Sequence, residues 1–267
     1  MNFFDQSLRV CAVLKKRLIG VITVKNGWAV QSFGYQRYLP IGRPAVVAEN
    51  LDRWGADEIL ILAIDRTLKR IGPDFELLET LGKLALSTPL TYGGGILNLD
   101  HASLVIKAGA ERICIDSLLH GEYSTLCDIA KKIGSQAIIG SLPLSKKAGK
   151  LQLYNYISKQ NSLLSPSLTK IFKNGLISEA IVIDWQHEGM ENGFNLDLIR
   201  HFPIRNIPLI GFGGLNNIVK IKKALKMSQV VAIGIGNFLN YKEHSLQHYK
   251  NILANFKIRL PDFASDT

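Results

Sequence analysis

The sequence predicts a single α/β domain with the (β/α)₈ barrel fold, built from two similar half-barrels. One observation is that short β-branched runs alternate with amphipathic stretches along nearly all of the 267 residues. Strands and helices follow each other in this order in α/β barrels. A second observation is that glycine pairs recur at a fixed offset in the two halves. The expected strands are also apolar throughout, so both of their faces should be buried.

Four strands and three helices are expected in the first half of the chain. The strands are the apolar runs at residues 17–24, 58–64, 89–92 and 112–115. The helices are the amphipathic stretches at residues 44–54, 74–86 and 98–108. Pro44 fits the first turn of its helix, and the Asn98 side chain can accept hydrogen bonds from the free N–H groups of the next helix.

The second half repeats the pattern, with strands at residues 137–142, 180–185, 208–212 and 230–235. One segment departs from it, because residues 146–167 are polar, contain Pro166 and lack a long apolar period. We expect an extended loop here after the fifth strand, with a short hairpin around residues 151–157. Long loops on barrels often belong to the functional face.

The internal repeat is clearest at two glycine pairs. Gly94-Gly95 and Gly213-Gly214 are 119 residues apart, and each pair follows a strand and precedes a helix. Ser117 and Gly236 each lie 22 residues beyond the second glycine of a pair, after the next strand. The agreement indicates a duplicated half-barrel. The alternative is that the matching offsets reflect only the repeat at each quarter of the barrel, which any (β/α)₈ barrel has.

The glycine pairs also suggest a ligand. Glycine lets backbone N–H groups approach an anion closely, and the following helix N-terminus adds a positive dipole end. Two such loops in symmetric positions predict two phosphate subsites on opposite sides of the barrel mouth. They favour a long bisphosphorylated or nucleotide ligand. The alternative is that both glycine pairs only form tight turns.

Composition narrows the function classes. The formal net charge of +10 has three possible explanations: binding of nucleic acid, binding of an anionic small molecule, or a basic surface composition without a binding role. No nucleic-acid module occurs, which argues against nucleic acid, and a phosphorylated or nucleotide substrate fits the charge equally well. No apolar run is long enough for a membrane helix, and the three cysteines form no CxxC pair. We expect a cytoplasmic protein without membrane or nucleic-acid partners, and without metal or cofactor, since its histidines lack metal-ligand spacing.

Catalysis in barrels takes place at the carboxyl ends of the strands. Asp65 and Asp184 are the carboxylates that we identify there, and no facing pair is apparent. Acid–base catalysis therefore has little support from these positions. The alternative role for both aspartates is to cap the helix that follows.

Charged residues begin the first, second, fourth and sixth strands. They are Arg17, Glu58, Arg112 and Glu179. In a barrel these side chains would converge at the floor, and buried charges need partners there. A four-member ion-pair ring is the resulting hypothesis, and four separate surface charges are the alternative.

Six segments occur in the order KKRLIGVITVKNG, GADEILILAID, TYGGGI, AGAERICIDS, ENGFNLDLI and GFGGLNN. Together they resemble the HisF family, the cyclase subunit of imidazole glycerol phosphate synthase. The resemblance covers residues 14–253. It implies a barrel of duplicated origin with a HisH-type glutaminase docked on its floor. It also implies that ammonia passes up the barrel to a bisphosphorylated nucleotide precursor at the top.

The resemblance also implies roles for individual residues. One phosphate subsite falls on Gly94, Gly95 and Ser117, and the other on Gly213, Gly214, Gly236 and Asn237. The family's floor gate, a ring of Arg, Glu, Lys and Glu, falls on Arg17, Glu58, Arg112 and Glu179.

The departures from the family pattern lie on the opposite face. The two catalytic aspartates of the family fall on Thr23, near the end of the first strand, and Pro143, near the end of the fifth. Neither a threonine hydroxyl nor a proline ring exchanges a proton near neutral pH. Ala63, Gln31 and residues 186–190 also differ from the family. The pattern implies that the partner and the ammonia path are kept while the cyclase reaction is lost or replaced.

Three hypotheses for function follow. In the first, the chain is similar to the HisF-like proteins of surface-polysaccharide gene clusters, and conducts ammonia to an amidotransferase that converts an acetamido sugar to an acetamidino sugar. In the second, it is a histidine-pathway cyclase, a lyase, that uses Asp65 or Asp184. In the third, it is a non-catalytic barrel that binds a phosphorylated ligand. Whether the chain is an enzyme stays open among them.

The ends of the chain lie outside the expected repeat. We expect residues 1–13 to be an N-terminal extension, residues 14–256 to form the barrel, and residues 257–267 to be a C-terminal tail.

Overall fold

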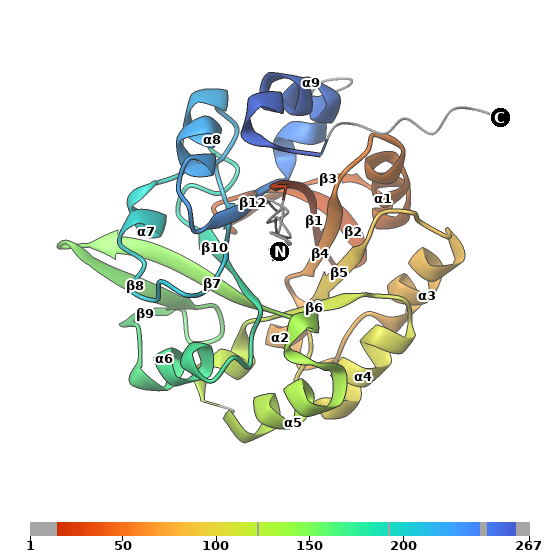
Figure 1. Cartoon of the computed structure of the whole chain (residues 1–267). Coiled ribbons are helices and arrows are strands. Elements are labelled where there is room, and N and C mark those ends of the chain that lie inside the picture. Colours follow the sequence, from red (N-terminus) through yellow and green to blue (C-terminus); the bar gives the residue numbers. More distant parts are fainter. Residues whose placement is uncertain (1–14, 122, 192, 241–244, 260–267) are drawn as a thin grey trace, which may run out of the picture.

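The computed structural model describes residues 15–121, 123–191, 193–240 and 245–259. Eight parallel strands form a closed barrel in this part of the chain, which confirms the predicted fold (Figure 1). In order around the barrel they are β1 (Arg17–Lys25), β4 (Glu58–Ala63), β5 (Leu90–Gly93), β6 (Arg112–Ile115), β7 (Ile138–Lys147), β10 (Glu179–Asp184), β11 (Leu209–Phe212) and β12 (Val230–Ile235). Pairing of β12 with β1 closes the barrel.

Helices surround the barrel on its outer side (Figure 1). They are α1 (Pro44–Arg53), α2 (Arg66–Lys69), α3 (Phe75–Lys83), α4 (Leu99–Lys107), α5 (Tyr123–Ile133), α6 (Pro166–Lys173), α7 (Asp197–Arg200), α8 (Ile218–Leu225) and α9 (Ser245–Ile252). Short 3₁₀ turns lie at Ser117–His120, Ser135–Ala137, Asn237–Asn240 and Ala254–Phe256. None of the helices that the structure describes is long and apolar enough to cross a membrane.

Local sequence explains where the first-half helices begin. Pro44 occupies the first turn of α1. The Asp74 side chain accepts a hydrogen bond from Leu77 N at 3.1 Å, and the Asn98 side chain accepts one from His101 N at 2.8 Å. These bonds satisfy N–H groups that have no partner inside the helix. The three helices begin within one residue of the predicted positions and end up to three residues earlier.

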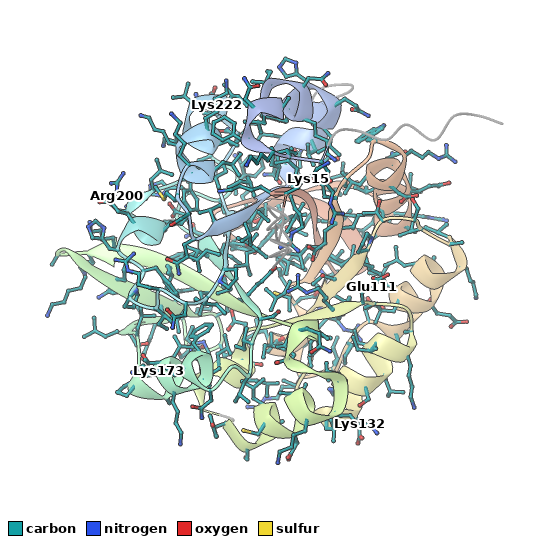
Figure 2. The ribbon with its side chains drawn as sticks, viewed as in Figure 1. Lys15, Glu111, Lys132, Lys173, Arg200 and Lys222 are labelled. Atoms are coloured by element: carbon teal, nitrogen blue, oxygen red, sulfur yellow. The ribbon has the colours of Figure 1, made fainter. Side chains whose placement is uncertain are left out.

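The positive charge is spread around the outside of the barrel. Lys132, Lys173, Arg200 and Lys222 lie on α5, α6, α7 and α8, four different outer helices (Figure 2). Such a distribution is typical of a solvated surface rather than of one binding face.

Two antiparallel hairpins extend the barrel beyond the carboxyl ends of its strands. β2 (Trp28–Phe33) and β3 (Arg37–Gly42) follow β1, and β8 (Lys150–Asn155) and β9 (Gln160–Leu163) follow β7.

The expectation of an extended loop at residues 146–167 is therefore wrong for most of the segment. β7 continues to Lys147, and the expected hairpin around residues 151–157 overlaps β8 alone among the strands. Leu144 of β7 pairs with Leu153 of β8, and both side chains are buried. Alternate residues of this polar segment thus contribute apolar contacts, a period-2 pattern that is easily missed in a short strand.

Two groups of buried side chains make up the core. The larger lies between the barrel and the helices. The smaller fills the barrel interior, which we call the lumen, and consists of Ile19, Val21, Leu60, Leu62, Cys114, Ile139, Ile181, Ile183, Ile210, Phe212 and Ala232. The lumen is therefore lined mainly by apolar side chains, with the hydroxyls of Thr91 and Ser141 among them.

The chain end packs against the start of the barrel. Ile258 is buried, and it forms a parallel bridge with Lys16, whose backbone N–H donates to Lys257 O at 3.1 Å. Packing thus continues past residue 256, the expected end of the barrel. The expected extension at residues 1–13 and the rest of the tail, residues 260–267, lie outside the described residues.

Candidate functional site

Strand geometry aligns the candidate residues in columns along the lumen. Side chains alternate between the two faces of a strand, so every second residue of a barrel strand faces the interior. On β1 the face that carries lumen residues also has Arg17 at the amino end and Thr23 near the carboxyl end. On β6 the same face has Arg112 at the amino end, and Asp116 follows in register beyond the strand.

The four predicted floor charges meet in a ring, which we call the floor ring: Arg17, Glu58, Arg112 and Glu179. Arg17 lies 3.2 Å from the Glu58 carboxylate and 2.7 Å from that of Glu179. Arg112 lies 3.8 Å from Glu58 and 2.9 Å from Glu179. Each charge therefore has two partners of opposite sign, and the alternative of four separate surface charges is excluded.

Neighbouring hydroxyls hold the floor ring in place. Thr91 of β5 donates a hydrogen bond to Glu58 at 2.5 Å, and Arg112 donates to the Ser178 hydroxyl at 2.9 Å. The Glu58 side chain is 4% exposed, whereas the other three are 15–18% exposed. The floor ring thus closes the amino end of the lumen and is still in contact with solvent.

A cavity of about 290 Å³ opens at the carboxyl end of the lumen. We call it the top cavity. Its floor includes the lumen residues Leu62, Cys114 and Ile183. Gly94 and Ser117, two predicted phosphate ligands of the first half, both line it. The structure therefore brings these two together at the mouth of the barrel.

The third predicted ligand of the first half, Gly95, lies beside this cavity. Its backbone N–H donates to the Thr67 hydroxyl at 2.9 Å, and Thr67 lines the cavity. The glycines have a second, structural role. A Cβ on Gly94, which has a φ of +126°, would lie 2.2 Å from Ala63 O. The loop thus requires glycine for backbone packing, whatever it binds.

The predicted phosphate ligands of the second half also lie together, but around a hollow of only about 10 Å³. They are Gly213, Gly214, Gly236 and Asn237. The Asn237 side chain accepts a hydrogen bond from Ser32 N at 3.2 Å and donates to Ser32 O at 2.6 Å. A hollow of this size holds about one water molecule. The two halves are therefore alike in sequence and unlike in free space.

A buried carboxyl lines the hollow in the second half. Glu188 is 2% exposed, and burial raises its pKa from 4.5 to about 7. Its backbone oxygen accepts a hydrogen bond from Gly34 N at 2.8 Å. Contacts from β2 and from the following turn thus cover the second half of the barrel mouth.

The two positions at which the resemblance places the family's catalytic aspartates lie inside the barrel mouth. Thr23 pairs with Leu62 on the neighbouring strand, and Pro143 pairs with Ile183. Thr23 and Pro143 are both buried. Pro143 stands within β7 and has no backbone N–H to donate.

The two aspartates considered as candidates for catalysis are engaged in local structure. Asp65 forms an ion pair with Lys69 at 2.7 Å. Asp184 accepts a hydrogen bond from Asn195 N at 2.7 Å, and one of its oxygens lies 2.9 Å from His187 Nδ1. The expected helix-capping role is wrong in detail, since Asp65 precedes α2 without a capping bond and Asp184 binds a loop.

Sequence reasoning missed Asp116, a carboxylate that lines the top cavity. Its Oδ1 lies 3.3 Å from His120 Nε2. Burial raises the pKa of Asp116, and the adjacent His120 opposes part of that increase. The signal in the sequence is the alternation Arg112, Cys114, Asp116, which turns the carboxylate towards the lumen side.

Aromatic side chains cover the top cavity. Tyr35, from the turn between β2 and β3, and Tyr156, after β8, pack edge to face with ring centroids 5.5 Å apart. Tyr154 stacks on Trp185 at 4.1 Å. Burial raises the pKa values of Tyr35 and Tyr156 well above their ordinary value, so both phenols stay protonated at neutral pH. No group of three or more His, Cys, Asp or Glu suited to a metal ion is found among the residues described.

Comparison with known proteins agrees with this architecture. A family model described as histidine biosynthesis protein matches residues 17–245. The imidazole glycerol phosphate synthase subunit HisF of Exiguobacterium sp. is 27% identical over 248 residues, 92% of this chain and 96% of that protein. The putative subunit hisF2 of Vibrio vulnificus is 26% identical over 266 residues, 93% and 92% of the two chains. A putative HisF subunit of Leptospira interrogans is 26% identical over 255 residues, 92% and 97%. Since the family model covers well over half of the chain, the protein belongs to the histidine biosynthesis protein family, as a HisF-like barrel.

Proposed function

We propose that this chain is the barrel subunit of a two-component glutamine amidotransferase. A HisH-type glutaminase docks on the barrel floor, and ammonia enters through the floor ring and leaves at the top cavity. The observation that carries the proposal is the closed ring of Arg17, Glu58, Arg112 and Glu179 below an apolar lumen. The names of the HisF relatives support the glutaminase partner.

The lumen suits neutral ammonia. Its lining is mainly apolar, and an isolated ammonium ion is costly to move into such surroundings. Leu62, Cys114 and Ile183 belong both to the lumen and to the floor of the top cavity. Ammonia released below the floor ring would thus reach the cavity without crossing bulk water. The ion pairs of the ring must part or shift for it to enter.

The proposal includes loss of the cyclase reaction. Thr23 and Pro143 occupy the positions of the family's catalytic aspartates, and neither can act as a general acid or base near neutral pH. The ammonia would then serve a different acceptor. We propose amidation of an acetamido sugar in surface-polysaccharide biosynthesis, completed by a separate sugar amidotransferase.

The first test couples the barrel to a HisH-type glutaminase encoded in the same genome. We expect glutamine hydrolysis to depend on the barrel, and we expect Glu58→Ala and Arg112→Ala to alter the hydrolysis rate. Arg53→Ala is the control, because Arg53 lies on α1 and is 72% exposed. If both floor-ring variants leave the glutaminase rate unchanged, the ammonia path is wrong and a phosphate-binding barrel without an ammonia role is favoured.

The second candidate function is the histidine-pathway cyclase. It is favoured by relatives named as imidazole glycerol phosphate synthase subunits that match over nine-tenths of this chain. The test is complementation of a bacterial strain that lacks the cyclase subunit. We expect no growth without histidine, and growth would favour the cyclase instead.

A further inference from the structure

The top cavity contains polar atoms that the protein leaves without partners. Asp116 Oδ2 and the hydroxyls of Tyr35 and Tyr156 are buried and make no hydrogen bond within the described structure. All three residues line the cavity. Buried polar groups are paired in most proteins, and an unpaired one costs about 1–3 kcal/mol. Three such groups around one cavity indicate that a polar ligand completes them.

The arrangement of these groups favours a nitrogen group on the ligand. Asp116 has one oxygen beside His120 and the other unpaired, so the carboxylate can accept a further N–H bond. The aromatic rings of Tyr35 and Tyr156 lie in the same wall. A carboxylate among aromatic faces suits an amino or amidino group, which donates several hydrogen bonds and carries positive charge.

The free space limits the ligand to one phosphate. The top cavity of about 290 Å³ reaches the first glycine pair only, whereas the hollow at the second pair holds about 10 Å³. The double hydrogen bond between Asn237 and Ser32 closes that second position. A phosphate group is larger than the single water for which the hollow has room. The cavity is also at the small end of ligand sites, which suits a sugar-sized molecule.

We propose that the top cavity binds a singly phosphorylated, sugar-sized molecule with an amino or amidino group. The phosphate lies at Gly94 and Ser117, and the nitrogen group lies between Asp116 and the hydroxyls of Tyr35 and Tyr156. The inference rests on the phosphate subsite predicted from the first glycine pair, at Gly94 and Ser117, and is independent of the ammonia path of the proposed function.

Calorimetric titration of the whole chain tests the nitrogen subsite. The probes are glucosamine 6-phosphate and glucose 6-phosphate, which differ in one amino group. We expect the amino sugar to bind about tenfold more tightly, the value of one charge-assisted hydrogen bond. Asp116→Asn should reduce this preference to about twofold or less while glucose 6-phosphate still binds. Asp100→Asn, the same change on exposed α4, should keep it.

Equal affinity for the two sugars in the native chain would overturn the nitrogen subsite. So would a preference that survives in the folded Asp116→Asn protein. Tyr156→Phe provides a second variant that keeps the ring and removes only the unpaired hydroxyl, and we expect weaker binding of the amino sugar.

A second pair of probes tests the single phosphate. Fructose 1,6-bisphosphate should bind no more than about threefold tighter than fructose 6-phosphate, because the second position is closed. Binding more than about tenfold tighter would overturn the single-phosphate inference. If none of these sugars and no inorganic phosphate bind, the phosphate subsite itself is wrong. The ammonia path is measured separately, by the glutaminase rate of floor-ring variants, so the two failures are distinguishable.

Discussion

Arg17 and Glu179 meet across the barrel floor, with Nη2 of the arginine 2.7 Å from Oε2 of the glutamate. They stand on β1 and β10, 162 residues apart in sequence. The same carboxylate oxygen accepts from Arg112 at 2.9 Å. Glu179 therefore joins two arginines that would otherwise share only the carboxylate of Glu58.

We predict that Glu179→Gln destabilises the chain by about 2 kcal/mol, because it leaves two partly buried arginines with one carboxylate. The measurement is the free energy of unfolding in urea. Glu49→Gln is the matched control, since Glu49 pairs with Arg53 on an exposed helix face and should cost less than about 0.5 kcal/mol. Equal losses in the two variants would show that the floor ring contributes no more than a surface pair.

The sequence predicts the barrel and the floor ring for the same physical reason. Apolar runs of the right length identify the strands, and in a parallel barrel all strand starts lie at one end. A charge at the start of a strand, such as Glu58 or Arg112, is thereby placed at the floor once the strand is recognised. No pairing partner has to be known in advance.

Features that depend on register or on distant pairing were not predictable in this way. The extension of β7 depends on its pairing with β8, and its polar residues alternate with leucines such as Leu144. Asp116 was missed because its place in the wall of the top cavity depends on the register of its strand, which alternates Arg112, Cys114 and Asp116 on the lumen side. The pair of Asp57, the residue before β4, and Lys250 of α9 spans 193 residues, and no local sequence pattern predicts it.

We predict that Lys250→Met lowers the free energy of unfolding by about 3–5 kcal/mol. Lys250 Nζ lies 2.7 Å from Asp57 Oδ1, and both side chains are almost fully buried, at 2% and 3% exposure. The other oxygen of Asp57 accepts from Leu18 N at 2.7 Å. Removal of the lysine leaves the buried Asp57 carboxylate without its positively charged partner, beside the start of β1. Adding Asp57→Asn to Lys250→Met should recover part of the lost free energy of unfolding in the same assay. A double variant that is less stable than Lys250→Met alone would contradict this account.

We predict that Glu188→Gln stabilises the chain in a pH-dependent manner. The pKa of Glu188 is raised from 4.5 to about 7 by burial, so the folded state favours the protonated form. The native chain therefore loses stability as the pH rises from about 4.5 to about 7, because over this range the Glu188 carboxyl ionises in the unfolded chain but stays protonated in the folded one. Glutamine is neutral throughout. The free-energy advantage of the variant should be near zero at pH 4 and reach about 3 kcal/mol above pH 7.

The measurement for Glu188 is urea unfolding of both proteins across this pH range. Glu191→Gln, on an exposed residue nearby, provides the control and should give a difference that does not change with pH. If the difference in free energy of unfolding between Glu188→Gln and the native chain also does not change with pH, the Glu188 carboxyl is solvated in solution.

We predict that Gly94→Ala destabilises the barrel by more than about 2 kcal/mol or prevents its folding. The backbone at Gly94 has a φ of +126°, and an added Cβ would lie 2.2 Å from Ala63 O, a backbone atom that cannot move without shifting β4. Gly27→Ala is the matched control, because Gly27 also has a positive φ, +78°, but has open space around it. It should cost only about 1 kcal/mol, the conformational term alone. Comparable losses in the two variants would mean that the close approach of β4 is not what requires glycine at position 94.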